Sequence, residues 1–359
     1  MRAFQPLAGL RVLDFSHVIA GPLASFYLAQ LGASVTKVES PDGDIMRKGR
    51  GLPAFIALNA GKDCIRLDLN DEADRATALT LAGQADVLLD SLRPGVLDRF
   101  GLGATELRQT HPRLIYCAIS GFGRRGPWAE RPAYDHVVQA ATGMTLMAGG
   151  ETDAPIKTGF PVVDSAAGII AALAILATLR ERDATGHGRF IDVAMSAAAM
   201  QLMYPMACDA LTRGTTPARV GNQGYSGSPA ADIFQARDGW LALGANTPRQ
   251  FVALLQVLGL ATLAVDPALF ETPLSASTPA QFLRSKDPVA LRVALVNAVL
   301  ERDADELECA CARAGVPAAR VRTIAEFATD AVTVDGLGTV RLAQDDIQIT
   351  SPGLGFRIS

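Results

Sequence analysis

Short apolar runs alternate with helix-like patterns through the first third of the chain. The runs typical of β-strands cover residues 10–15, 34–38, 63–69, 86–92, 114–120 and 189–193. The first helical pattern spans about residues 22–31, where Pro22 suits the first turn and Gly32 the position just beyond the end. Strands that alternate with helices form βαβ units. We therefore expect an α/β fold with a doubly wound, mostly parallel, Rossmann-like sheet.

The pattern changes after residue 193. Two further β-rich runs, 231–236 and 240–245, flank Arg237-Asp238-Gly239, a turn typical of a hairpin. Helical patterns then dominate residues 247–314. These features predict a smaller α+β domain at about 220–315, with a linker on each side.

Length and composition agree with two domains. The chain has 359 residues, of which 49% are hydrophobic and 19% charged, values typical of a soluble globular protein with a sizeable core. The large domain is expected to span 1–200 and to be completed by about 325–359. The net charge of −4 argues against nucleic acid as a partner, because phosphate binding needs a concentrated basic surface.

Location and metal content are also indicated by the sequence. The N-terminus lacks the apolar core of a signal sequence, and the alanine-rich run after Asp164 is too broken to favour a membrane span. The five cysteines are scattered and odd in number, which argues against a disulfide framework or a zinc site. We expect a cytoplasmic protein without a metal and without a membrane partner.

Asp164 is the only charged residue between Lys157 and Arg180. An ionised carboxylate is expensive to remove from water, so it should sit at the exposed mouth of an otherwise buried helix. One interpretation is a helix cap that accepts backbone N–H groups of the first turn. The other is a nucleophile. The two can coexist, because helix-start N–H groups keep a carboxylate ionised.

A glycine-rich loop, residues 121–127, follows the run that ends at Ser120. Open α/β sheets bind ligands at the carboxyl ends of their strands, so Arg124 and Arg125 could hold a phosphate there. An ordinary solvated turn explains the same residues. Glu39 resembles the ribose-binding acid of a dinucleotide fold, but Gly21 is the single glycine where that fold needs three, which argues against a nicotinamide enzyme.

Three nearby segments together resemble a known family. They are the 121–127 loop, Arg131-Pro132-Ala133-Tyr134-Asp135 with Gln139 and Gly143, and the Asp164 segment. The resemblance is to the class III CoA-transferases, which include carnitine and formyl-CoA transferases and α-methylacyl-CoA racemases. Further matches, in the family's order and spacing, are residues 6–14, 20–22, 31–33, 37–39, Asn59 with Lys62, 67–69, 93–95, 112–116, 120–123 and 314–317.

The resemblance implies roles for particular residues. Asp164, four residues before Gly168, matches the nucleophilic aspartate, and Tyr134 with Asp135 matches the adjacent active-site pair. The CoA contacts expected from the resemblance and from the arginine loop are His17, Val18, Ile19, Ala20, Arg47, Ser91, Leu92, Arg93, Arg99, Arg124 and Arg125. The family also implies a homodimer of two interlocked, ring-like subunits.

The implied chemistry is the transfer of CoA from an acyl-CoA to a carboxylic acid. A carboxylate attacks the thioester to give a mixed anhydride, and the thiolate returns to give an aspartyl-CoA thioester before the acceptor takes the CoA. CoA is then a substrate, with no permanently bound cofactor. N–H groups at the helix start could stabilise the oxyanion. Gly224 and Gly227, in the glycine-rich segment 221–227, could form a lid that excludes water, although a plain linker explains the same glycines.

Two other functions remain as alternatives. A racemase needs a second acid/base, which the racemases supply as a histidine where this chain has Tyr134, and His136 should point to another face of its helix. Transferase is therefore favoured over racemase. An inactive CoA-binding homologue is disfavoured by the intact Asp164. Ser40 and Ser91-Leu92 depart from the family's usual residues, and Ser359 ends the chain earlier than the resemblance leads us to expect.

Overall fold

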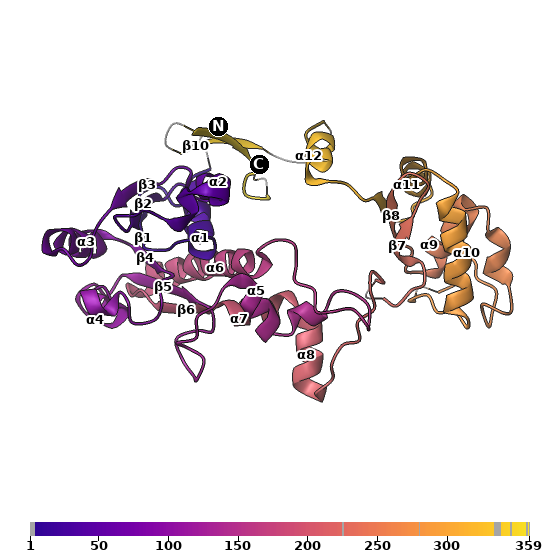
Figure 1. Ribbon diagram of the computed structural model, residues 1–359, viewed down its shortest axis with the longest axis horizontal. Helices are drawn as coiled ribbons and strands as arrows, with labels where there is room; N and C mark the ends of the chain where they lie inside the picture. Colours follow the sequence, from indigo (N-terminus) through magenta and orange to yellow (C-terminus); the bar gives the residue numbers. More distant parts are fainter. Residues whose placement is uncertain are drawn as a thin grey trace. The chain divides into compact units, whose positions relative to one another are not determined.

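The computed structural model describes residues 4–224, 226–279, 281–333, 339–344, 347–356 and 358. The chain forms two compact units, each drawn in Figure 1. The sheet unit comprises Met1–Met147, Pro155–Pro217 and Val334–Ser359, and the small unit comprises Ala148–Ala154 and Ala218–Thr333. The sequence-based division ended the small domain near residue 315, whereas the small unit continues to Thr333.

A six-stranded parallel sheet, in the order β3-β2-β1-β4-β5-β6, organises the sheet unit. Its strands are β1 (Arg11–Asp14), β2 (Ser34–Glu39), β3 (Asp63–Arg66), β4 (Val87–Asp90), β5 (Ile115–Ser120) and β6 (Phe190–Ala194). The central strands β4 and β5 are almost wholly buried, as expected for apolar runs in a sheet covered on both faces. The prediction of a parallel Rossmann-like sheet is confirmed.

Helices cover both faces of this sheet. The helices of this unit are α1 (Ala20–Gln30), α2 (Leu52–Asn59), α3 (Glu72–Gln84), α4 (Ala104–Thr110), α5 (Asp135–Ala141), α6 (Val162–Thr185), α7 (Met195–Leu202) and α8 (Tyr204–Arg213), and α8 packs on α7. Successive side chains of a strand point to opposite faces of the sheet, so each strand contributes to two hydrophobic cores, one on each face. Val12 and Val87 pack with α1, α6 and α7 in one core, whereas Leu13 and Leu88 pack with α3 and α4 in the other. Strands β10 (Val340–Gln344) and β11 (Ile347–Ser351) form an antiparallel pair.

Helix α6 is the central helix of the sheet unit. Its contact with α1 depends on Gly168, because a Cβ there would lie 2.6 Å from the carbonyl oxygen of Ala20. Of the helices that the structure describes, α6 alone is long and apolar enough to cross a membrane, with a mean hydropathy of 2.2. That is weak evidence for a span, since a buried core helix passes the same test.

The small unit contains an antiparallel sheet of β7 (Ala231–Gln235), β8 (Trp240–Gly244) and β9 (Ala318–Arg320). Its helices are α9 (Pro248–Val257), α10 (Pro288–Leu300), α11 (Ala304–Arg313) and α12 (Ile324–Thr333). The predicted hairpin is confirmed, with the turn closed by the Ala236 N–H donating to Gly239 O at 2.9 Å. Phe234, Phe251 and Leu295 are central to the core.

Candidate active site

Two neighbouring cavities open at the carboxyl edge of the parallel sheet, where the strand order reverses between β1 and β4. The first, which we call the Asp164 cavity, measures about 300 Å³ and is formed by the loops after β1, β4, β5 and β6, residues 129–134 and Asp164. The second, which we call the β2 cavity, measures about 450 Å³ and is formed by the loops after β1, β2 and β3. His17 and Leu92 line both cavities, so the two adjoin.

Asp164 is the third residue of α6 and is half-buried at the wall of the first cavity. Its carboxylate makes no hydrogen bond or ion pair with any residue that the structure describes. Burial, and after it the charge of Asp135, raises the pKa of Asp164 from 3.8 to about 7. Asp164 therefore titrates much closer to neutral pH than an ordinary aspartate.

Asp135, and not Asp164, caps helix α6. The buried carboxylate of Asp135 accepts the backbone N–H groups of Val163 at 2.7 Å and Asp164 at 3.0 Å. The interpretation of Asp164 as the cap is therefore wrong. The physical reason is that a residue from the preceding helix α5 already occupies the capping position, so Asp164 is left facing the cavity.

The helix start has no N–H group left for a substrate oxyanion. The Val162 N–H donates to Phe160 O at 2.8 Å and the Ser165 N–H to Pro161 O at 3.1 Å. Together with the two N–H groups bound by Asp135, these account for the first four donors of α6. The expectation that this helix start supplies oxyanion donors is therefore also wrong.

Asp135 lies beside Asp164 but outside the lining of the cavity. Gln139 donates to its other carboxylate oxygen and, at 2.9 Å, to Thr158 Oγ1. The Thr158 N–H in turn donates to Gln139 Oε1 at 2.9 Å. The predicted active-site residue Asp135 is thus placed to orient the backbone of Asp164 and to shift its pKa, rather than to touch a substrate.

The turn between β1 and α1, residues 17–20, forms one wall of the Asp164 cavity. Val18 has a φ of 66° and is the one non-glycine residue with positive φ in the described part of the chain. That conformation is strained for a β-branched residue. The His17 N–H donates to Ser91 Oγ at 3.0 Å, which joins this turn to the loop after β4.

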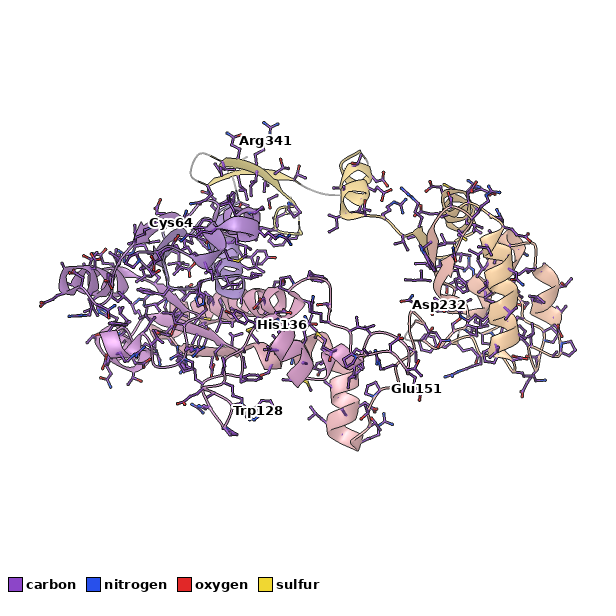
Figure 2. The ribbon with its side chains drawn as sticks, viewed as in Figure 1. Cys64, Trp128, His136, Glu151, Asp232 and Arg341 are labelled. Atoms are coloured by element: carbon purple, nitrogen blue, oxygen red, sulfur yellow. The ribbon has the colours of Figure 1, made fainter. Side chains whose placement is uncertain are left out.

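Most of the sequence-predicted site residues come together in this cavity. With Asp164, its lining contains His17, Val18, Ile19, Ala20, Ser91, Leu92, Arg93 and Tyr134. They are far apart in sequence, but each follows a strand or begins a helix at the same edge of the sheet. The rings of Tyr134 and His136 are stacked, with 6.4 Å between their centres. His136, which is labelled in Figure 2, does not line the cavity.

Four predicted CoA-binding arginines lie outside both cavities. Arg124 forms an ion pair with the buried Asp90, and its N–H donates to Asp192 at 2.9 Å. The charge of Arg124 therefore already compensates a buried carboxylate, and its contact with a phosphate stays a prediction. Arg47 pairs with Glu39 at 2.6 Å and stacks on Phe55 at 4.1 Å.

Arg99 and Arg125 are the other two arginines outside the cavities, and both are exposed.

The predicted lid glycines belong to the small unit. The Gly224 N–H donates to Ala231 O at 2.6 Å, and Gly227 has a φ of 68° that favours glycine. Tyr225 between them lies outside the described residues.

Sequence reasoning assigned no role to Arg131, which also lines the Asp164 cavity. Its guanidinium lies 4.3 Å from the centre of the Trp128 ring, on the loop labelled in Figure 2. Arg131 makes no ion pair with any residue that the structure describes. Its place three residues before Tyr134, in the matched segment 131–135, was the available signal.

The second cavity was also missed by sequence reasoning. It contains Phe15, Ser16, Lys37–Pro41, Gly43–Ile45, Leu67–Asn70 and Phe100, besides His17 and Leu92. The sequence feature that could have predicted this cavity is the position of these segments, because they follow β1, β2 and β3 at the same edge of the sheet. Among the described residues there is no group of three or more His, Cys, Asp or Glu side chains able to hold a metal ion.

Comparison with known proteins identifies the family. The sequence model of CoA-transferase family III matches residues 7–359. Acetyl-CoA:oxalate CoA-transferase of Acetobacter aceti is 36% identical over 331 residues, which cover 90% of this chain and 82% of the relative. Succinate–glutarate CoA-transferase of Agrobacterium fabrum is 32% identical over 364 residues, which cover 97% of this chain and 88% of the relative.

Solved structures agree with the sequence comparison. Rv3272 of M. tuberculosis matches with a TM-score of 0.84 and 31% identity, covering 99% of this chain and 93% of that one. A CAIB/BAIF family protein from Brucella suis matches with a TM-score of 0.80 and 31% identity, covering 94% of this chain and 89% of that one. The fold, the family-wide sequence match and the curated relatives together place this chain in CoA-transferase family III, as an enzyme of that class.

Proposed function

We propose that this enzyme moves CoA from an acyl-CoA thioester to a carboxylic acid through covalent intermediates on Asp164. The observation that carries the proposal is the carboxylate of Asp164, which faces a cavity at the ligand-binding edge of the sheet without a protein partner. A carboxylate held in this way is free to attack, and its loss of hydration makes it a stronger nucleophile than an exposed one.

The steps balance without a metal or a redox partner. A carboxylate oxygen of Asp164 attacks the thioester carbonyl, and the CoA thiolate leaves to give an acyl-aspartyl anhydride. The thiolate then attacks the aspartyl carbonyl of the anhydride, which releases the donor acid and forms an aspartyl-CoA thioester. The acceptor carboxylate attacks that thioester, and the thiolate finally attacks the acceptor's acyl carbon, which restores the carboxylate of Asp164.

The two adjoining cavities support a binding mode for CoA. The thioester end would lie beside Asp164, and the nucleotide end would extend past His17 and Leu92 into the β2 cavity. The lining residue Arg93 is available near the passage between them. Racemisation is the weaker alternative, because the racemases carry a histidine where this chain has Tyr134, and the nearby His136 does not line the Asp164 cavity.

The acceptor is proposed to be a small dicarboxylic acid. The relatives are named for oxalate, glutarate, D-citramalate and mesaconate, all of which carry two carboxylates. One carboxylate takes the CoA, and the other needs a cation. Arg131 supports this proposal, since its charge has no acidic partner among the described residues and lies in the cavity lining.

Three further features are proposed on the family resemblance. Two copies form an interlocked homodimer, segment 221–227 closes over the intermediates as a lid, and the enzyme acts in the cytoplasm. Ile169 and Leu173, one turn apart on α6, are exposed apolar residues that a second copy could cover. Light scattering of the purified protein tests the dimer, and a monomer at micromolar concentration would contradict it.

Trapping the covalent intermediate tests the mechanism. The protein is incubated with an acyl-CoA, quenched with hydroxylamine and digested, and we expect mass spectrometry to find a hydroxamate at Asp164. Asp164→Asn should lose the hydroxamate and the transfer activity, whereas Asp183→Asn, an exposed residue of the same helix, should retain both. Full activity of Asp164→Asn would falsify the mechanism. Rapid α-proton exchange of a 2-methylacyl-CoA without an acceptor acid would instead indicate a racemase.

A further inference from the structure

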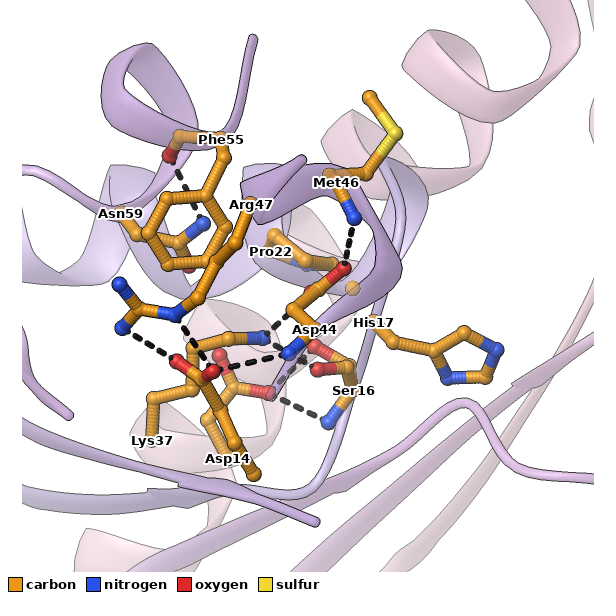
Figure 3. Close-up of polar contacts among 12 residues, drawn as sticks. Asp14, Ser16, His17, Pro22, Lys37, Asp44, Met46, Arg47, Phe55 and Asn59 are labelled. Carbon is orange, nitrogen blue, oxygen red and sulfur yellow. Dashed lines mark hydrogen bonds and ion pairs between the residues drawn. The ribbon is translucent and has the colours of Figure 1, made fainter. Parts of the chain in front are cut away.

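A cluster of buried charges lies directly behind the turn that forms the cavity wall. We call it the buried lysine cluster, and it consists of Asp14, Lys37, Asp44 and Lys62 with Ser16. Figure 3 labels Asp14, Ser16, Lys37 and Asp44. The side chains of Lys37, Lys62 and Asp14 are fully buried, at 0% exposure each. Lysines are rarely buried so completely unless each ammonium has partners, so the contacts of these two indicate their purpose.

Lys37 binds the chain just before the turn. Its ammonium donates to the carbonyl oxygen of Ser16 at 2.6 Å and lies 3.2 Å from the carboxylate of Asp44. Ser16 is also held from the other side, because its N–H donates to Asp14 at 2.8 Å and its hydroxyl donates to the same carboxylate oxygen. The residue two positions before Val18 is thus fixed in place.

Lys62 binds the chain just after the turn. Its ammonium donates to the carbonyl oxygen of Pro22, in the first turn of α1, and to Asn59 Oδ1, both at 2.9 Å. It also lies 3.4 Å from Asp14. Although burial alone would raise the pKa of Asp14, the charges of Lys62 and Lys37 lower it below its usual value.

The two lysines therefore hold the carbonyl groups on either side of residues 17–20. Within that interval Val18 has its strained φ of 66°. Neighbouring groups leave little room for the turn to move, because a Cβ on Gly21 would lie 2.1 Å from the Cβ of Ser16. A strained residue persists only where its surroundings impose the conformation, and the two buried ammonium groups bind the chain on both sides of Val18.

We propose that Lys37 and Lys62 are positioning residues, which hold Val18 in the left-handed conformation and so keep the His17–Ala20 wall in the shape that binds acyl-CoA. The proposal rests on the proposed function only in taking acyl-CoA as the ligand of this wall. Neither lysine lines the Asp164 cavity, so neither touches the reacting atoms there. Lys37 does line the β2 cavity, so a direct contact with CoA must be distinguished from positioning, and the Val18→Gly comparison below does this. Their effect should appear in binding of the CoA donor rather than in the chemical step.

A pair variant tests this without leaving a buried charge unpaired. Lys37→Met with Asp44→Asn removes the Ser16 contact and both charges at similar side-chain volume. We expect the KM for acyl-CoA to rise by about tenfold or more while kcat at saturation changes by less than about threefold. Direct calorimetry with free CoA should show the same loss of affinity.

Adding Val18→Gly separates positioning from general stability. Glycine adopts positive φ freely, so the turn should no longer depend on Lys37, and the triple variant should recover the KM of Val18→Gly alone to within about threefold. A lysine that acts only through overall stability predicts no recovery, since glycine makes the unfolded chain more flexible. The proposal would be overturned if the triple variant combined the full KM increases of the pair variant and of Val18→Gly. An unchanged KM in the pair variant would also overturn it.

Two controls keep the outcome interpretable. If the pair variant yields no folded protein, Lys62→Met, which removes the donor to Pro22 and leaves Asp14 the charge of Lys37, is compared with and without Val18→Gly and judged by the same two results. Free CoA binding to the wild-type protein is measured first. Its absence would contradict the proposed function itself, whereas normal binding with no rescue by Val18→Gly contradicts only the positioning role.

Discussion

The raised pKa of Asp164 predicts that the nucleophile destabilises the folded protein at neutral and alkaline pH. The folded-state pKa of about 7 lies above the ordinary value of 3.8, so folding favours the protonated form. The stability associated with that proton is fully present below the unfolded-state pKa. It is lost as the pH rises through the folded-state value. Asp164→Asn cannot ionise, so it should not show this loss.

The magnitude follows from the size of the shift. A shift from 3.8 to about 7, at about 1.36 kcal/mol per unit, corresponds to a total of about 4 kcal/mol as an upper figure. Between pH 5 and pH 8 the wild-type protein should lose about 2 to 3 kcal/mol relative to Asp164→Asn. Most of this change should fall between pH 5 and pH 7, and the difference should level off above the folded-state pKa.

Urea unfolding at several pH values measures the difference. Trp128 lies in the sheet unit and Trp240 in the small unit, so fluorescence in a Trp240→Phe background reports the unit that contains Asp164. Protein concentration is held constant because association shifts apparent stability. Asp183→Asn on the exposed part of α6 should show no such pH-dependent gain. A stability difference between wild type and Asp164→Asn that does not vary with pH would refute the reasoning.

Three other outcomes follow from the same geometry. The kcat/KM for acyl-CoA should rise with pH to a plateau, with a midpoint near the Asp164 pKa of about 7. Asp135→Asn should move that midpoint to lower pH, because the charge of Asp135 raises the pKa of Asp164. An unmoved midpoint would contradict this role of Asp135. Gly168→Ala should destabilise the protein by about 1 to 3 kcal/mol in chemical denaturation and raise KM, because a Cβ there meets a backbone oxygen at 2.6 Å. Asp183→Ala, at an exposed position of the same helix, should change little. Arg131→Met should raise the KM for dicarboxylic acceptors about tenfold and leave that for monocarboxylic acceptors unchanged, and equal effects on both would contradict the proposed contact.

The fold could be predicted where sequence signals are local. Strands β4 and β5 are buried apolar runs, and Pro22 and Gly32 mark a helix start and end by their own backbone preferences. The order of those elements then limited the sheet topology, and topology put the loops after the strands at one edge. Topology thus predicted the edge that binds ligands, whereas the family resemblance named most of the residues that line the Asp164 cavity.

Partners distant in sequence could not be predicted in this way. Arg124 stands in a loop that suits a phosphate, but the chain brings it against Asp90 on the neighbouring strand. Asp164 stands where a helix cap is expected, but Asp135 from another helix occupies that role. Side-chain pairing across elements depends on distances that only folding sets, so local patterns showed neither the Asp90 partner of Arg124 nor the capping contacts of Asp135.

The sequence by itself determined the α/β architecture, the family and the identity of Asp164 as the exceptional carboxylate, because hydrophobic periodicity and motif spacing are properties of the chain. The tertiary structure decided how that carboxylate behaves. Burial and the nearby Asp135 raise its pKa to about 7, and the absence of a partner among the described residues leaves it facing the cavity. Tertiary structure also placed Lys37 and Lys62 on either side of Val18, since ammonium groups find carbonyl partners only after the strands have assembled.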